Sequence, residues 1–83
     1  MTDADILERI RAIFQDNFAI DPARVSPASH LFEELDLDSI DAVDLAIKLQ
    51  EMTGQRIKPE EFKSVRTVGD VIAAVHGLLA RAP

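Results

Sequence analysis

Apolar residues near the start of the chain recur at the spacing of one helix face. Those at i, i+4, i+7 and i+8 are Ile6, Ile10, Ile13 and Phe14. Thr2 precedes them and is placed to cap a helix, because its hydroxyl accepts a hydrogen bond from a first-turn amide. Negative charge at Asp3 and Asp5 suits the exposed amides of a helix start. This pattern predicts a first helix over residues 3–17.

A second amphipathic pattern lies near the other end of the chain. Its apolar stripe consists of Val68, Val71, Ile72, Val75, Leu78 and Leu79. Thr67 stands just before this stripe, and Asp70 follows it by three positions, which is the spacing of a helix cap. The pattern predicts a last helix over residues 68–81.

Residues 39–52 are apolar over most of the circumference of a predicted helix, which Asp38 and Gly54 are placed to begin and end. The stripe that can face a bundle consists of Leu45, Ala46, Leu49 and Met52. A second stripe, beside the charged face, consists of Ile40, Val43 and Ile47. A small bundle has no central position for such a helix, so the second stripe predicts a docking surface. The alternative is that the preceding loop folds over Ile40 and Val43.

The connection between the first two helices is long, covering residues 19–38. Loops of this length are usually functional or partly structured, and we expect its apolar residues to pin it across the bundle: Val25, Leu31, Phe32, Leu35 and Leu37. Pro59 is placed at the first position of a short helix over residues 59–63. No segment alternates like a strand. The sequence therefore predicts one all-α domain over residues 1–83, a four-helix bundle of three long helices and one short one, with a long loop between the first two helices.

Negative charge is concentrated in residues 33–44, which contain no Lys or Arg. The acidic residues there are Glu33, Glu34, Asp36, Asp38, Asp41 and Asp44, and the remaining acids and bases of the chain balance, so the whole net charge of -6 belongs to this segment. Such a charge disfavours nucleic acid as a partner and favours basic protein surfaces. A merely solvated acidic loop is the alternative.

The chain contains no cysteine, which excludes disulfides and thiolate metal sites. No apolar run approaches the roughly 20 residues of a membrane-spanning helix, and the first residues do not resemble a signal peptide. We therefore expect no membrane span and a cytoplasmic protein.

Neither catalysis nor metal binding is expected. Ser39 would need a base to act as a nucleophile, and the spacing places neither His30 nor His76 beside it. The clustered aspartates lack the central glycine and the terminal glutamate of an EF-hand loop. We predict no enzyme activity and no metal site.

The tract Leu-Asp-Leu-Asp-Ser-Ile-Asp-Ala-Val-Asp-Leu, residues 35–45, resembles the Asp-Ser-Leu tract of acyl carrier proteins. The likeness extends over nearly the whole chain, because the helix lengths, the long first loop, the short third helix and the acidic second helix are similar to the family pattern. The resemblance implies that the Ser39 hydroxyl bears 4'-phosphopantetheine donated by coenzyme A. It also implies that acyl groups travel on this arm as thioesters between enzymes.

The resemblance further implies partners and the residues that meet them. The partners are a phosphopantetheinyl transferase, a ketosynthase and other acyl-processing or acyl-transferring enzymes with basic docking patches, and the carrier is expected to be a monomer. The positions that match the family's docking helix are Asp38, Ile40, Asp41, Val43, Asp44, Ile47 and Glu51. A shelter for the acyl chain is expected among Leu45, Ala46, Leu49, Ile57, Phe62 and Ala73.

Some residues differ from the family pattern, and these differences bear on which biosynthetic pathway the carrier serves. Ile40 replaces the usual leucine, and Lys48 and Gln50 dilute a helix that is more uniformly acidic in housekeeping fatty-acid carriers. The tract is similar to carriers of bacterial polyketide-type systems, such as those that make aryl polyenes, and fatty-acid synthesis stays open. Two other interpretations are a peptidyl carrier domain, whose serine usually follows a Gly-Gly-His-type stretch, and an unmodified acidic helical interaction domain.

Overall fold

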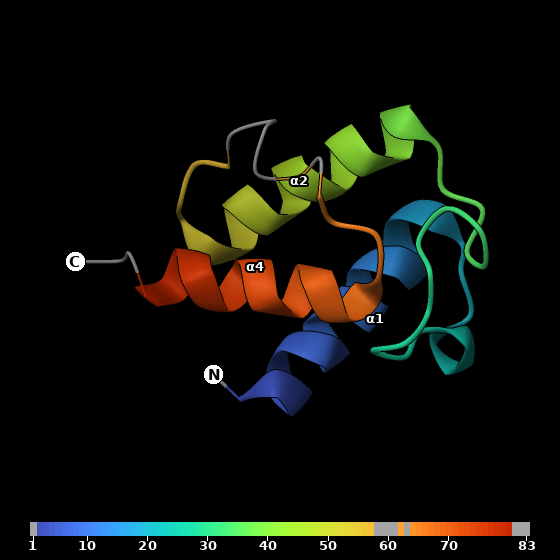
Figure 1. Cartoon of the computed structure of the whole chain (residues 1–83), viewed down its shortest axis with the longest axis horizontal. Helices are drawn as coiled ribbons and strands as arrows, with labels where there is room; N and C mark the ends of the chain where they lie inside the picture. Colours follow the sequence, from blue (N-terminus) through green and yellow to red (C-terminus); the bar gives the residue numbers. More distant parts are fainter. Residues whose placement is uncertain (1, 58–61, 63, 81–83) are drawn as a thin grey trace.

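Three long helices form the body of the molecule in a computed structural model, which describes residues 2–57, 62 and 64–80. They are α1 (Asp3–Phe18), α2 (Ser39–Thr53) and α4 (Val68–Ala80), and a short 3₁₀ helix, η1 (Pro22–Arg24), lies in the loop after α1. Each long helix contacts the other two, and in Figure 1 α4 crosses between α2 and α1. No strand occurs within these ranges, so the prediction of an all-helical fold is confirmed.

The helix ends follow the local signals in the sequence. Thr2 caps α1, and its hydroxyl accepts a hydrogen bond from the Asp5 amide at 3.2 Å. The helix runs one residue beyond the predicted range, through Phe18, whose ring packs edge-on against Phe14. Gly54 ends α2 in the left-handed conformation (φ 69°), which glycine adopts without a steric penalty.

The expected short helix over residues 59–63 falls almost wholly outside the described residues. Phe62 is the one residue of this expected helix that the structure describes, and it packs against the core. The described part of the chain therefore shows three helices and a 3₁₀ turn rather than a complete four-helix bundle. Arg81, the last residue predicted for the final helix, also lies outside it.

The long loop is fixed to the start of α4 by main-chain hydrogen bonds. The Leu31 amide donates to the Arg66 carbonyl at 2.8 Å, and the Gly69 amide donates to the Pro27 carbonyl at 2.8 Å. Gly69 permits this approach, because a Cβ there would lie 3.0 Å from the Pro27 carbonyl oxygen. The loop consequently follows a defined path to the start of α2.

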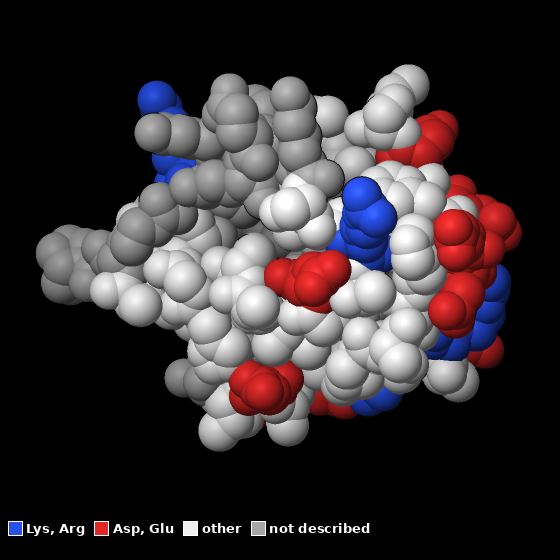
Figure 2. Space-filling view, viewed as in Figure 1, with Lys and Arg blue, Asp and Glu red and all other residues white. Residues whose placement is uncertain are grey.

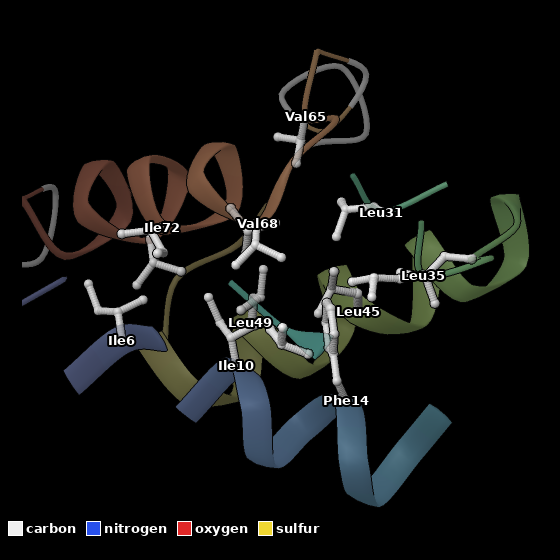
Figure 3. Packing of buried hydrophobic residues seen from close by; sticks show 14 of the residues in the cluster. Ile6, Ile10, Phe14, Leu31, Leu35, Leu45, Leu49, Val65, Val68 and Ile72 are labelled. Atoms are coloured by element: carbon white, nitrogen blue, oxygen red, sulfur yellow. The ribbon is translucent and has the colours of Figure 1, made fainter. Parts of the chain in front are cut away.

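The core is aliphatic apart from Phe14, and it joins all three helices to the loop. Ile6, Ile10 and Phe14 of α1 are fully buried, and in Figure 3 Leu45 and Leu49 of α2 lie among them. The buried apolar residues of the loop are Ile20, Val25, Leu31, Leu35 and Leu37. Phe32 was expected to pin the loop as well, but its side chain is 39% exposed. None of the described helices is long and apolar enough to cross a membrane.

Candidate functional site

Ser39 is the first residue of α2, and the local sequence fixes this position. Asp38 caps the helix, since its carboxylate accepts a hydrogen bond from the Asp41 amide at 2.9 Å. The Asp41 carboxylate in turn accepts one from the Asp38 amide at 3.2 Å. This reciprocal cap begins the helix at Ser39 and leaves its side chain exposed.

The start of α2 retains donors that a phosphate group suits. The first amides of a helix have no partner within the helix. Asp38 engages the Asp41 amide, and no hydrogen bond in the described part of the chain engages the amides of Ser39 and Ile40. A phosphate on the Ser39 oxygen would lie near these amides and near the positive end of the helix. The carboxylates of Asp38 and Asp41 oppose that attraction.

Acidic residues lie on both sides of Ser39 along the chain. Asp38 and Asp44 are exposed, and Asp41 is half-buried. Figure 2 shows acidic side chains gathered at the end of the molecule where the loop meets the start of α2, with a basic group beneath them. This surface is electrostatically suited to basic protein surfaces.

The second apolar stripe of α2 is open to solvent. Ile40 is 71% exposed, Val43 60% and Ile47 44%. The alternative interpretation, in which the loop covers Ile40 and Val43, is therefore wrong. The apolar residues of the loop, apart from the partly exposed Phe32, are turned into the core. The stripe lies beside Ser39 and the acidic side chains.

An apolar hollow opens beside Ser39, with a volume of about 690 Å³. Ser39 and Gln50 contribute the polar side chains of its lining. The other lining residues are Phe32, Ala42, Val43, Ala46, Ile47, Ile57, Phe62 and Val65. A chain attached at Ser39 could reach apolar surface in this hollow without crossing the core.

The residues expected to shelter an acyl chain are divided by the structure. Ala46, Ile57 and Phe62 line the hollow. Leu45 and Leu49 are fully buried in the core instead. Ala73 is exposed on α4, because the buried face of that helix is formed by its apolar stripe and Ala73 lies on the opposite side. The expectation for Ala73 is therefore corrected.

Several residues of the hollow were missed by the sequence reasoning. They are Phe32, Ala42, Val43, Ile47, Gln50 and Val65. Part of this set had a signal, because Ser39, Ala42, Val43, Ala46 and Gln50 are spaced along one face of a helix. Phe32 and Val65 had no such signal in the sequence, since only the folded path of the chain brings them to the hollow.

The two histidines have structural partners of their own. The Nδ1 atom of His30 accepts hydrogen bonds from the amides of Phe32 and Glu33, at 3.2 and 3.1 Å. His76 pairs with Asp3 through its Nε2 atom and joins α4 to α1. Neither of these contacts involves Ser39. No group of three or more His, Cys, Asp or Glu side chains that could hold a metal ion occurs among residues 2–57, 62 and 64–80.

Known proteins match both the sequence and the fold. A family described as "Phosphopantetheine attachment site" matches residues 8–75. Acyl carrier protein 2 of Ralstonia nicotianae is 85% identical over 80 residues, which are 96% of this chain and 99% of that protein. The acyl carrier protein of Thermosynechococcus vestitus is 36% identical over the same shares of the two chains. The crystal structure of an acyl carrier protein from Thermotoga maritima has a TM-score of 0.84 at 28% identity, covering 94% of this chain and 91% of the other.

The chain belongs to the phosphopantetheine-attachment family and, within it, to the acyl carrier proteins. Proteins of this family carry a covalently attached 4'-phosphopantetheine and are carriers rather than enzymes. They interact in general with phosphopantetheinyl transferases and with acyl-processing enzymes. These family properties agree with an exposed serine beside an apolar hollow.

Proposed function

We propose that Ser39 is the attachment site of 4'-phosphopantetheine and that the chain carries acyl groups as thioesters on this arm. The observation that carries the proposal is the position of Ser39. It is exposed at the first position of α2, and it borders the apolar hollow. The arm would start at the surface that enzymes approach, while its apolar cargo has a surface to rest on.

Attachment makes one bond and breaks one bond. The Ser39 oxygen attacks the phosphorus of coenzyme A that bears the pantetheine chain, and a phosphodiester forms. The pyrophosphate linkage breaks, adenosine 3',5'-bisphosphate leaves, and the serine proton passes to a base of the transferase. This chain supplies an oxygen held at a capped helix start, and the nearby amides of Ser39 and Ile40 suit the phosphodiester.

The docking surface in this proposal combines charge and apolar contact. Its members are Asp38, Ile40, Asp41, Val43, Asp44, Ile47 and Glu51. The exposed apolar stripe supports this role, since no described element covers it. The partners are the transferase, a ketosynthase and other acyl-processing or acyl-transferring enzymes with basic patches. Electrostatic attraction speeds their encounter with the carrier and leaves the complexes short-lived.

The finer architecture and setting belong to the same proposal. Residues 1–83 would form a single, monomeric acyl carrier domain in the cytoplasm, with a short helix over residues 59–63 as the fourth helix of the bundle. Its cargo would be an intermediate of fatty-acid or polyketide-type synthesis. The names of the relatives favour an acyl over a peptidyl carrier.

The attachment site is tested by intact mass. Wild type, Ser39→Ala and Ser64→Ala are incubated with coenzyme A, magnesium and a broad-specificity phosphopantetheinyl transferase. We expect one arm on wild type and on Ser64→Ala, whose exposed serine lies outside the hollow's lining, and none on Ser39→Ala. An arm on Ser39→Ala would assign the site elsewhere. An unmodified wild type, beside a known carrier that is labelled, would favour the unmodified interaction domain.

A further inference from the structure

The charge along α2 is negative near its start and neutral near its end. The acidic residues of the first half are Asp38, Asp41 and Asp44, with no base among them. Lys48 follows, about 13 Å along the helix from Ser39. Its ammonium lies 3.9 Å from a carboxylate oxygen of Glu51, and both side chains are partly exposed. The second half of the helix therefore presents a neutralised pair instead of a fourth free acid.

A second cation lies on the same side of α2. Lys48 and Glu51 share a shallow groove between α1 and α2 with Arg9, which is exposed on α1. Two cations and one carboxylate thus border this groove. The apolar stripe runs along α2 from Ile40, beside the acidic end, to Ile47, the residue before Lys48.

We propose that Lys48 is a specificity-determining residue of the carrier. This inference rests on the proposed docking through α2 and names the partner that fits it. The matching enzyme surface has its basic residues opposite the Ser39 end of α2 only, and it places a neutral or acidic side chain opposite Lys48. An enzyme whose basic patch continues along the whole helix meets Lys48 with a like charge.

Charge complementarity gives Lys48 this discriminating effect. Like charges brought together across an interface oppose a wrong partner, while opposite charges speed the encounter with the right one. The pairing of Lys48 with Glu51 also withdraws one carboxylate from any basic residue of the partner. Because both groups are partly exposed, the effect acts at low salt and is screened as salt is raised.

The test uses a ketosynthase whose docking groove is basic along its full length, and it measures acyl transfer from the acylated carrier. The variants are Lys48→Glu and Lys48→Gln, with Ala4→Glu as a control that gives the same net charge as Lys48→Gln. Ala4 is exposed in the first turn of α1, where an acid suits the helix start. In Figure 1 that turn lies at the opposite end of the molecule from the start of α2.

We expect Lys48→Gln to raise kcat/KM about two-fold and Lys48→Glu about five-fold, through KM, as exposed charge pairs allow. Ala4→Glu should match wild type, and the gains should fall in about 0.5 M salt, where charges are screened within about 4 Å. Equal values for Lys48→Glu and Ala4→Glu would overturn the inference, as would a gain that high salt leaves intact. Failure of the proposed function is distinct, because it would appear earlier as a carrier that accepts no arm.

Discussion

Asp70 shows how one carboxylate fixes the start of a helix. It accepts hydrogen bonds from the amides of Arg66 and Thr67, at 3.1 and 3.2 Å, and the Asp70 amide donates to the Thr67 hydroxyl. These hydrogen bonds lower the pKa of Asp70 below its ordinary value of 3.8, and the one from the Arg66 amide has the larger effect. Thr2 lowers the pKa of Asp5 in the same way at the start of α1.

The lowered pKa predicts how acid acts on stability. Because the pKa of Asp70 is lower in the folded than in the unfolded chain, its ionised form stabilises the fold above about pH 3.8. This contribution disappears as the pH falls through the lowered pKa. Asp70→Asn should therefore be less stable than wild type at about pH 6, and the difference should shrink toward about pH 3. Urea unfolding at both pH values measures the difference in free energy of unfolding between the two proteins. A difference that is the same at both pH values would contradict the assigned cap.

Single residues also show what local sequence can predict. The caps at Thr2, Asp38 and Thr67 were predicted, because a cap depends on side chains three positions apart. Phe32 and Ala73 were misplaced. Their surroundings depend on how the loop and α4 pack, which no short window of sequence contains.

At the scale of the element, α2 has two apolar faces with different roles. Leu49 is fully buried in the core, whereas Ile47 is 44% exposed beside the hollow. Figure 3 shows Leu49 among residues of α1 and α4. The inner face therefore stabilises the bundle, and the outer face is available to a partner.

A matched pair of variants separates these roles. Leu49→Ala should lower the free energy of unfolding by about 2–5 kcal/mol, because it leaves a cavity in a packed core. Ile47→Ala should lower it by less than about 1 kcal/mol. It should nevertheless raise the KM of the loaded carrier for a ketosynthase, because it removes part of the proposed docking stripe. Denaturant unfolding and transfer kinetics measure the two effects. A normal KM with a large loss of stability in Ile47→Ala would contradict an outward role for this face.

At the scale of the whole molecule, the sequence predicted the three long helices and the exposed stripe. It did so because helix periodicity reports which faces are buried. The hollow was predicted only in part. Its lining joins Phe32 of the loop, the α2 face and Val65, which lie far apart in the sequence. The main-chain bonds that fix the loop to α4 have no side-chain pattern, so only the folded chain reveals them.

The folded molecule thus holds one exposed serine at the junction of an acidic surface, an apolar stripe and an apolar hollow. In the proposed function, the serine serves attachment, the outer surface serves docking, and the hollow accommodates cargo. These roles require that the acyl group be bonded covalently to the thiol of the arm and not to a side chain of the protein.

The most direct measurement loads the carrier with an acylated arm. A broad-specificity transferase and hexanoyl-coenzyme A should add one hexanoyl-phosphopantetheine to wild type and nothing to Ser39→Ala. Hydroxylamine, which cleaves thioesters, should then remove the hexanoyl group and leave the arm in place, as intact mass will show. An acyl group that persists where a known acyl carrier loses it, or one that appears on Ser39→Ala, would contradict thioester carriage on Ser39.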